Sequence, residues 1–95
     1  PQKTKKSTWT FLTNHSHVLL CLAINPAMLA REIAVEVGIT ERAVLRILKE
    51  LVDDEYITVI KKGRCNTYYI DQDKYLKHSI EEHCKIGAIL DLLKK

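Results

Sequence analysis

Residues 29–51 constrain the fold more than any other stretch, because they hold two helical patterns separated by one glycine. In the first pattern, apolar residues recur at the spacing of one helical face: Leu29, Ile33, Ala34 and Val37. Gly38 follows at once, at a position where a helix end favours a residue that tolerates a left-handed backbone. We therefore expect a first helix that ends near Gly38.

A second helix is predicted to start directly after this turn. Ile39 is apolar and can fill the angle between the helices, and the Thr40 side-chain oxygen can cap the second one. A buried stripe follows at i, i+3, i+4, i+7 and i+8, made of Ala43, Val44, Ile47, Leu48 and Leu51. The opposite face carries Glu41, Arg42, Leu45, Arg46 and Lys49. This order is typical of a helix-turn-helix and indicates an element that reads DNA.

The composition fits one soluble globular domain. The chain has 95 residues, of which 46% are hydrophobic and 28% charged. A net charge of +3 favours an anionic partner, although the distribution of the charge matters more than its sum. The best apolar run, residues 18–24, is far shorter than the roughly 18 residues of a membrane span, so we expect no membrane association.

The reactive side chains form no pattern typical of an enzyme or a metal site. Cysteines are three in number and without paired spacing, which argues against a disulfide-stapled secreted domain and favours the cytoplasm. There is no glycine-rich phosphate loop and no nucleophile motif, so we expect no enzyme, no catalytic residue and no cofactor. We also expect no metal, because no strong ligand spacing links His15, His17, His78, His83 and Cys84.

Three segments precede the helix-turn-helix. Residues 1–8 form a basic tail that we expect to be flexible and solvated, with a DNA-contacting arm as the alternative. Trp9 and Phe11 are expected to cover one end of the core or a subunit contact. Thr13 or Asn14 can cap a helix that runs to about Ile24 and buries Val18, Leu19, Leu22 and Cys21.

A β-hairpin is predicted after the second helix of the motif. Residues 56–61 and 66–70 are rich in β-branched and aromatic side chains, and a basic loop with a central glycine lies between them. From residue 56 to residue 70 there are three cations, Lys61, Lys62 and Arg64, and no acid. A basic hairpin in this position is the wing of a winged helix.

The last segment, residues 72–95, is predicted to hold a helix opened by a capping box of Ser79 and Glu82. Residues 71–95 carry as many cations as acids, so this segment is not the DNA face. Its apolar stripe must pack somewhere, and we expect it to pair with a second subunit, packing on its own core being the alternative. The predicted dimer interface consists of Ile80, His83, Ile86, Ile89, Leu90 and Leu93.

With these elements in place, residues 9–84 resemble winged helix-turn-helix transcriptional regulators of bacteria and archaea, in the broad MarR- and ArsR-like group. The resemblance rests on WTFLTNHSHVLLCLA, on LAREIAVEVGITERAVLRILKELVDDEYI and on KKGRCNTYYI. It implies an α+β fold that is mainly α, with a winged helix-turn-helix over residues 9–71. It also implies operator DNA as partner, a homodimer and, in many relatives, a small-molecule or metal effector that the resemblance does not identify.

Two departures from that group bear on function. Metal-sensing ArsR-like members typically carry a cysteine pair at the start of the recognition helix, and residues 38–44 contain no cysteine. The chain therefore does not fit this kind of thiolate sensor. Cys65 stands where relatives tend to place an arginine beside Arg64, which weakens the expected grip of the wing on phosphate.

The recognition helix, residues 40–53, is long enough to lie in a major groove, and its first two turns can approach base edges. We expect Glu41, Arg42 and Leu45 to read bases, Arg42 by a bidentate contact to guanine. The DNA backbone is assigned to Thr40, Arg46, Lys49, Lys61, Lys62, Arg64 and Asn66, with the wing, residues 61–66, on the backbone or in a minor groove.

Two other functions stay open on the same fold. A winged helix can serve as a protein-interaction module without DNA, its charged helix face and lysine-rich edge strand being only solvated surface. Alternatively, the chain is a repressor that responds to a small molecule or a metal.

Overall fold

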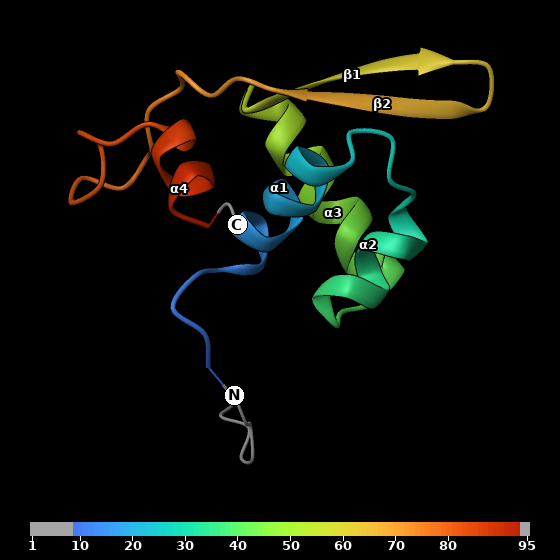
Figure 1. The fold of residues 1–95 in the computed structure, drawn as a ribbon, viewed down its shortest axis with the longest axis horizontal. Coiled ribbons are helices and arrows are strands. Elements are labelled where there is room, and N and C mark those ends of the chain that lie inside the picture. Colours follow the sequence, from blue (N-terminus) through green and yellow to red (C-terminus); the bar gives the residue numbers. More distant parts are fainter. Residues whose placement is uncertain (1–8, 94–95) are drawn as a thin grey trace.

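The computed structural model describes residues 9–93 and shows four helices and one two-stranded antiparallel sheet in that range (Figure 1). The fold is a winged helix-turn-helix, as expected. The elements are α1 (Asn14–Ile24), α2 (Ala30–Val37), α3 (Glu41–Asp53), β1 (Ile57–Lys62), β2 (Cys65–Ile70) and α4 (Ile86–Leu93). The basic tail predicted for residues 1–8 lies outside the described residues.

Helix α1 is the centre of the core. It contacts α2, α3, α4 and β2, and its side chains Val18 and Leu22 are 0% and 1% exposed. The predicted stripe of Val18, Leu19, Cys21 and Leu22 is confirmed. Thr13 precedes the helix in extended conformation, and its carbonyl accepts from the amides of Ser16 and His17. None of the described helices has the length and apolar character of a membrane span.

The turn between α2 and α3 has the predicted geometry. Gly38 adopts a left-handed conformation with φ of 86°. The amides of Gly38 and Ile39 both donate to the Ala34 carbonyl, at 2.8 and 3.1 Å. Thr40 Oγ1 then accepts from the Ala43 amide at 3.0 Å and caps α3. The two apolar faces meet in the core through Ile33, Ala34, Val44, Ile47, Leu48 and Leu51.

The exit from α3 is fixed by a second left-handed residue, Glu55, with φ of 64°. The Tyr56 amide donates to the Leu51 carbonyl and the Glu55 amide to the Val52 carbonyl, both at 2.9 Å. This is the hydrogen-bond pattern of a Schellman motif, whose left-handed position usually holds glycine. Tyr56 is buried, and its hydroxyl donates to the Tyr75 carbonyl at 2.9 Å. These bonds set the direction in which the chain enters β1.

The wing is a tight hairpin that projects beyond the helices (Figure 1). Its register runs from Ile57 opposite Ile70 to Lys62 opposite Cys65, which leaves a two-residue turn of Gly63 and Arg64. Gly63 has φ of 62° and Arg64 has no positive φ, the combination of a type II′ turn. The strands therefore extend further toward the turn than predicted, and most of the expected loop is sheet.

The C-terminal segment differs from its prediction. Residues 79–83 form turns instead of a capped helix, and α4 begins only at Ile86. His78 Nδ1 accepts from the Ile80 amide at 3.1 Å, which is a local alternative to helical bonding. A bridge between Tyr75 and Lys85 then closes the loop, with the Leu76 amide donating to the Cys84 carbonyl at 2.9 Å. These bonds hold the segment before α4 as a closed loop.

The apolar stripe of α4 is largely used inside this chain. Ile86 and Leu90 are 4% and 5% exposed in the shared core, so their assignment to a dimer interface is wrong. Packing on the chain's own core, the alternative, holds for these two residues. Ile89 and Leu93 are half-buried, Ile80 and His83 are exposed, and the exposed Leu92 was not predicted.

Trp9 and Phe11 do not cover the core. Their rings contact each other edge to face, with centroids 4.9 Å apart, and both side chains are exposed. The expectation that they close one end of the core is therefore wrong, and a subunit contact is what remains of that prediction.

Replacing Glu55 by glycine should stabilise the protein. A left-handed backbone costs a residue with a Cβ about 1 kcal/mol, and glycine adopts it without that strain. We expect Glu55→Gly to raise the free energy of unfolding by about 0.5–1 kcal/mol in urea denaturation. Glu55→Ala is the control, because it removes the charge and keeps the Cβ. Equal stabilisation by both variants would assign the effect to charge.

Candidate nucleic-acid interface

The outward face of α3 carries the predicted base readers. With 13 residues the helix is about 20 Å long, enough to lie in a major groove. Glu41 and Arg42 are exposed in its first turn, and Leu45 is 52% exposed although it is a large apolar residue. Among the described residues, neither Glu41 nor Arg42 has a side-chain partner, so both charges are available to a ligand.

The two cations further along α3 are already paired. Arg46 Nη1 lies 3.4 Å from Glu50, and Lys49 Nζ lies 2.8 Å from Asp53 Oδ2. The hydrogen bond and charge of Asp53 raise the pKa of Lys49. All four side chains are substantially exposed, so each pair is weak and can exchange for a phosphate. Thr40 uses its oxygen as the cap acceptor, and its hydroxyl hydrogen remains a donor.

The wing and the recognition helix share a groove of about 270 Å³. Its lining includes Leu45, Lys49 and Asp53 from α3 and Val59, Lys61 and Asn66 from the wing. Side chains alternate along a strand, so Lys62, next to Lys61, lies on the other face of the hairpin. Arg64 lies at the turn. The structure thus brings together Leu45, Lys49, Lys61 and Asn66, and leaves Lys62 and Arg64 toward the tip.

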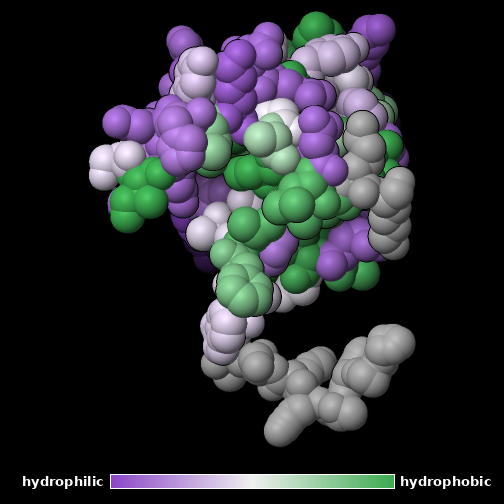
Figure 2. All heavy atoms as spheres, turned by 60° about the vertical axis from the view of Figure 1, so that its left-hand side comes forward, coloured by the Kyte–Doolittle hydropathy of each residue, from purple (hydrophilic) through white to green (hydrophobic). Residues whose placement is uncertain are grey.

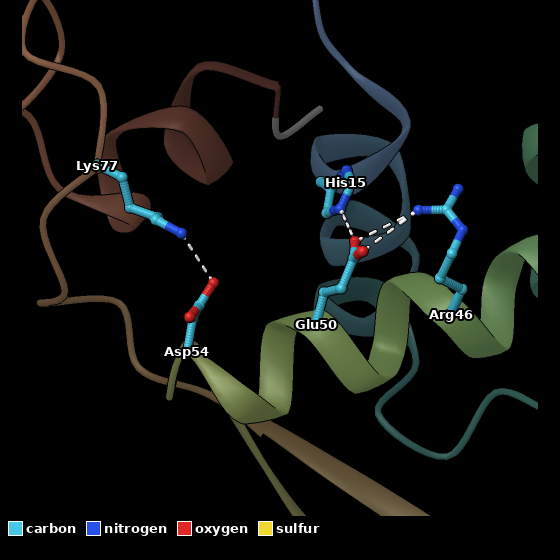
Figure 3. A network of polar contacts seen from close by, with 5 residues as sticks. All are labelled: His15, Arg46, Glu50, Asp54 and Lys77. Carbon is cyan, nitrogen blue, oxygen red and sulfur yellow. Dashed lines mark hydrogen bonds and ion pairs between the residues drawn. The ribbon is translucent and has the colours of Figure 1, made fainter.

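Figure 3 shows a polar network of His15, Arg46 and Glu50 that joins α3 to α1 and was not predicted. His15 Nε2, at the start of α1, lies 2.7 Å from Glu50 Oε1, and the Arg46 guanidinium approaches the same carboxylate. The hydrogen bond with His15, helped by Arg46, holds the pKa of Glu50 below its usual range. His15 and Glu50 are 35 positions apart, so no local spacing pattern could have paired them.

A second ion pair ties the end of α3 to the segment before α4. Lys77 Nζ lies 2.9 Å from Asp54 Oδ2, and Figure 3 shows this pair beside the His15 network. The hydrogen bond and charge of each partner lower the pKa of Asp54 and raise that of Lys77. Neither residue was predicted to have a role, because 23 positions separate them along the chain.

The histidines and cysteines remain dispersed. Within residues 9–93, no three histidine, cysteine or acidic side chains gather in a way that could hold a metal ion. His15 and His78 are used in hydrogen bonds, and the three cysteines are free thiols, with Cys21 buried. Burial raises the pKa of the Cys21 thiol.

Residues 13–58 match the family of winged helix-turn-helix DNA-binding domains. The matched segment covers α1, α2 and α3 and reaches the start of the wing. A search of curated proteins finds no relative of the chain. The fold is that of a winged helix-turn-helix, and the match supports double-stranded DNA as a partner. A place in the MarR- or ArsR-like group stays a prediction.

The link between His15 and Glu50 should give the stability a defined pH dependence. Because the pKa of Glu50 is lowered in the folded state, the ionised carboxylate stabilises the fold above its unfolded pKa of about 4.3. That contribution is lost as the pH falls through the folded pKa. We therefore expect Glu50→Gln to lower the free energy of unfolding at pH 6, and the difference from wild type to disappear toward pH 3.

Urea denaturation at several pH values measures this effect. Glu41→Gln is the control, because Glu41 is an acid on the same helix that has no side-chain partner in the described part of the chain. A Glu50→Gln difference that stays constant from pH 6 to pH 3 would contradict the assignment.

Proposed function

We propose that the chain is a cytoplasmic transcription regulator that binds specific sites in double-stranded DNA. The observation that carries this proposal is the groove between α3 and the wing, bordered by Lys49 and Lys61. Arg42 and Arg64, two cations without side-chain partners in the described part of the chain, extend the basic surface along α3 and to the wing tip. The family match of residues 13–58 supports the same partner.

In this proposal the first turns of α3 read base edges. Arg42 donates two hydrogen bonds to a guanine, Glu41 accepts from a cytosine amino group, and exposed Leu45 contacts a thymine methyl group. Arg46 and Lys49 exchange their acidic partners for phosphates. Lys61, Lys62, Arg64 and Asn66 hold the backbone or reach into a minor groove. Catalysis has no part in this function.

Removing Arg42 should reduce sequence discrimination. We expect Arg42→Ala to weaken binding to a selected operator by about 1–3 kcal/mol, while binding to random duplex changes much less. Competition titrations with both DNAs measure this. Arg31→Ala on α2 is a matched control, because Arg31 is an exposed arginine away from the groove between α3 and the wing. If both variants lost the same discrimination, α3 would not be the reading helix.

Removing cations from the wing should weaken binding to every duplex about equally. Each phosphate contact releases counterions, so affinity falls steeply with salt. We expect the Lys62→Ala/Arg64→Ala double variant to bind random duplex more weakly and to have a salt slope smaller by about one per lost contact. Binding at several salt concentrations tests the proposed function directly. A folded wild-type protein that binds no duplex at low salt would overturn it in favour of a protein-interaction module.

The chain is further proposed to act as a homodimer on a site with two-fold symmetry, with recognition helices about 34 Å apart. Support comes from large apolar side chains left exposed around α4. Ile80 is 76% exposed and Leu92 is 79% exposed, and Ile89 and Leu93 are only half-buried nearby in sequence. His83 is exposed within the same segment.

A charge on this surface should separate the subunits. We expect Leu92→Lys to shift the protein from dimer to monomer in sedimentation velocity while its circular dichroism stays that of the folded wild type, because Leu92 is outside the core. Val35→Lys is the control, since Val35 is 81% exposed on α2. An unchanged dimer in Leu92→Lys would place the interface elsewhere.

A further inference from the structure

A hollow of about 530 Å³ lies between the start of α1, the end of α3 and the segment before α4. In Figure 2 the side of the molecule that carries α4 shows hydrophobic residues at its centre, bordered by hydrophilic ones. The apolar lining includes side chains of the core itself: Leu19, Leu51, Tyr56 and Ile86. A hollow of this size with an apolar floor has the character of a small-molecule site.

The rim of the hollow is polar, and most of its charged side chains form ion pairs with each other or with residues nearby. Lys77 is held by Asp54, and Glu50 is held by His15 and Arg46. These two carboxylates are therefore balanced by cations. In the described part of the chain, the Glu81 side chain has no such partner and leaves the rim with one uncompensated negative charge.

An anionic ligand is disfavoured, because the single lysine of the rim is already paired and the excess charge is negative. The ligand that complements the hollow has an apolar body and one positive charge.

We propose that this hollow binds a small organic cation, whose apolar body rests on Leu19, Leu51 and Ile86 and whose charge lies at Glu81. The inference has a regulatory consequence that rests on the proposed DNA-binding function. Glu50 belongs to the rim and also contacts Arg46 on the outward face of α3. A cation in the hollow competes with Arg46 for the Glu50 carboxylate on the same rim and leaves Arg46 available to phosphate, so occupancy of the hollow raises DNA affinity.

Phenethylammonium is a suitable probe, with 2-phenylethanol and 3-phenylpropionate as neutral and anionic analogues of similar shape. In amide-resolved NMR titrations of the full chain, we expect phenethylammonium to bind in the millimolar range and to shift residues around the hollow. Both analogues should bind at least threefold more weakly. Equal binding of the three, or shifts spread over the whole protein, would overturn the proposal.

A matched pair of variants tests the charge that the site uses. Glu81→Gln should weaken phenethylammonium at least threefold, whereas Glu82→Gln should leave it unchanged, because Glu82 is exposed and is not part of the hollow. Both residues are in the turns before α4, away from the core, so both variants should fold. Equal effects would mean general attraction to an acidic surface and would contradict the site.

The regulatory step has its own readout. Saturating phenethylammonium should raise the affinity of wild type for random duplex at least twofold. Arg46→Gln should lower DNA affinity and lose the response to the probe, while it binds the probe at least as tightly as wild type because Glu50 loses its cation. A wild type that binds probe and DNA without influence of one on the other would overturn the regulatory step. Failure of DNA binding itself leaves the NMR titration decisive for the site, so the two failures are distinguishable.

Discussion

The burial of α1 is the constraint on which the rest of the structure depends. Val18 and Leu22 are almost fully enclosed, and α1 contacts α2, α3, α4 and β2. Burying a side chain of that size contributes about 1.5–3 kcal/mol, which is large against the 5–15 kcal/mol of a whole domain. The wing is attached to the same region, because the Tyr68 amide donates to the Pro26 carbonyl just after α1 at 2.9 Å. The helices and the hairpin therefore keep one relative orientation.

Helix α3 carries three surfaces whose separation follows from helical geometry. Its buried stripe from Val44 to Leu51 joins the core, its outward arc carries Arg42 and Lys49, and its flank carries Glu50. Since Glu50 pairs with Arg46 on the outward arc and with His15 on α1, an event on the flank can reach the outward arc through a single carboxylate. The proposed coupling needs only a change of partner between exposed charges and no movement of the core.

The C-terminal segment shows where local pattern and tertiary packing disagree. Ser79 and Glu82 have the spacing of a capping box, yet residues 79–83 form turns inside a loop that the bridge between Tyr75 and Lys85 closes. The apolar spacing of Ile86 and Leu90 correctly indicated a helix face. The surface against which that face packs depends on the tertiary structure. In this chain α4 packs on α1, and both residues are buried in the shared core.

From the sequence alone, the helix-turn-helix, its glycine turn, the Thr40 cap and the existence of a wing could be determined. Each depends on the conformational preferences of residues close together in the chain, such as the left-handed Gly38. Only the tertiary structure decided that His15 meets Glu50, that Lys77 meets Asp54, and that Lys61 and Lys62 lie on opposite faces of the hairpin. The charge pairs join side chains far apart in the chain, and the register depends on where the turn closes. Local preference does not determine the charge pairs, because they depend on how the buried faces pack together. The register follows from the two-residue turn of Gly63 and Arg64, which places both lysines in β1.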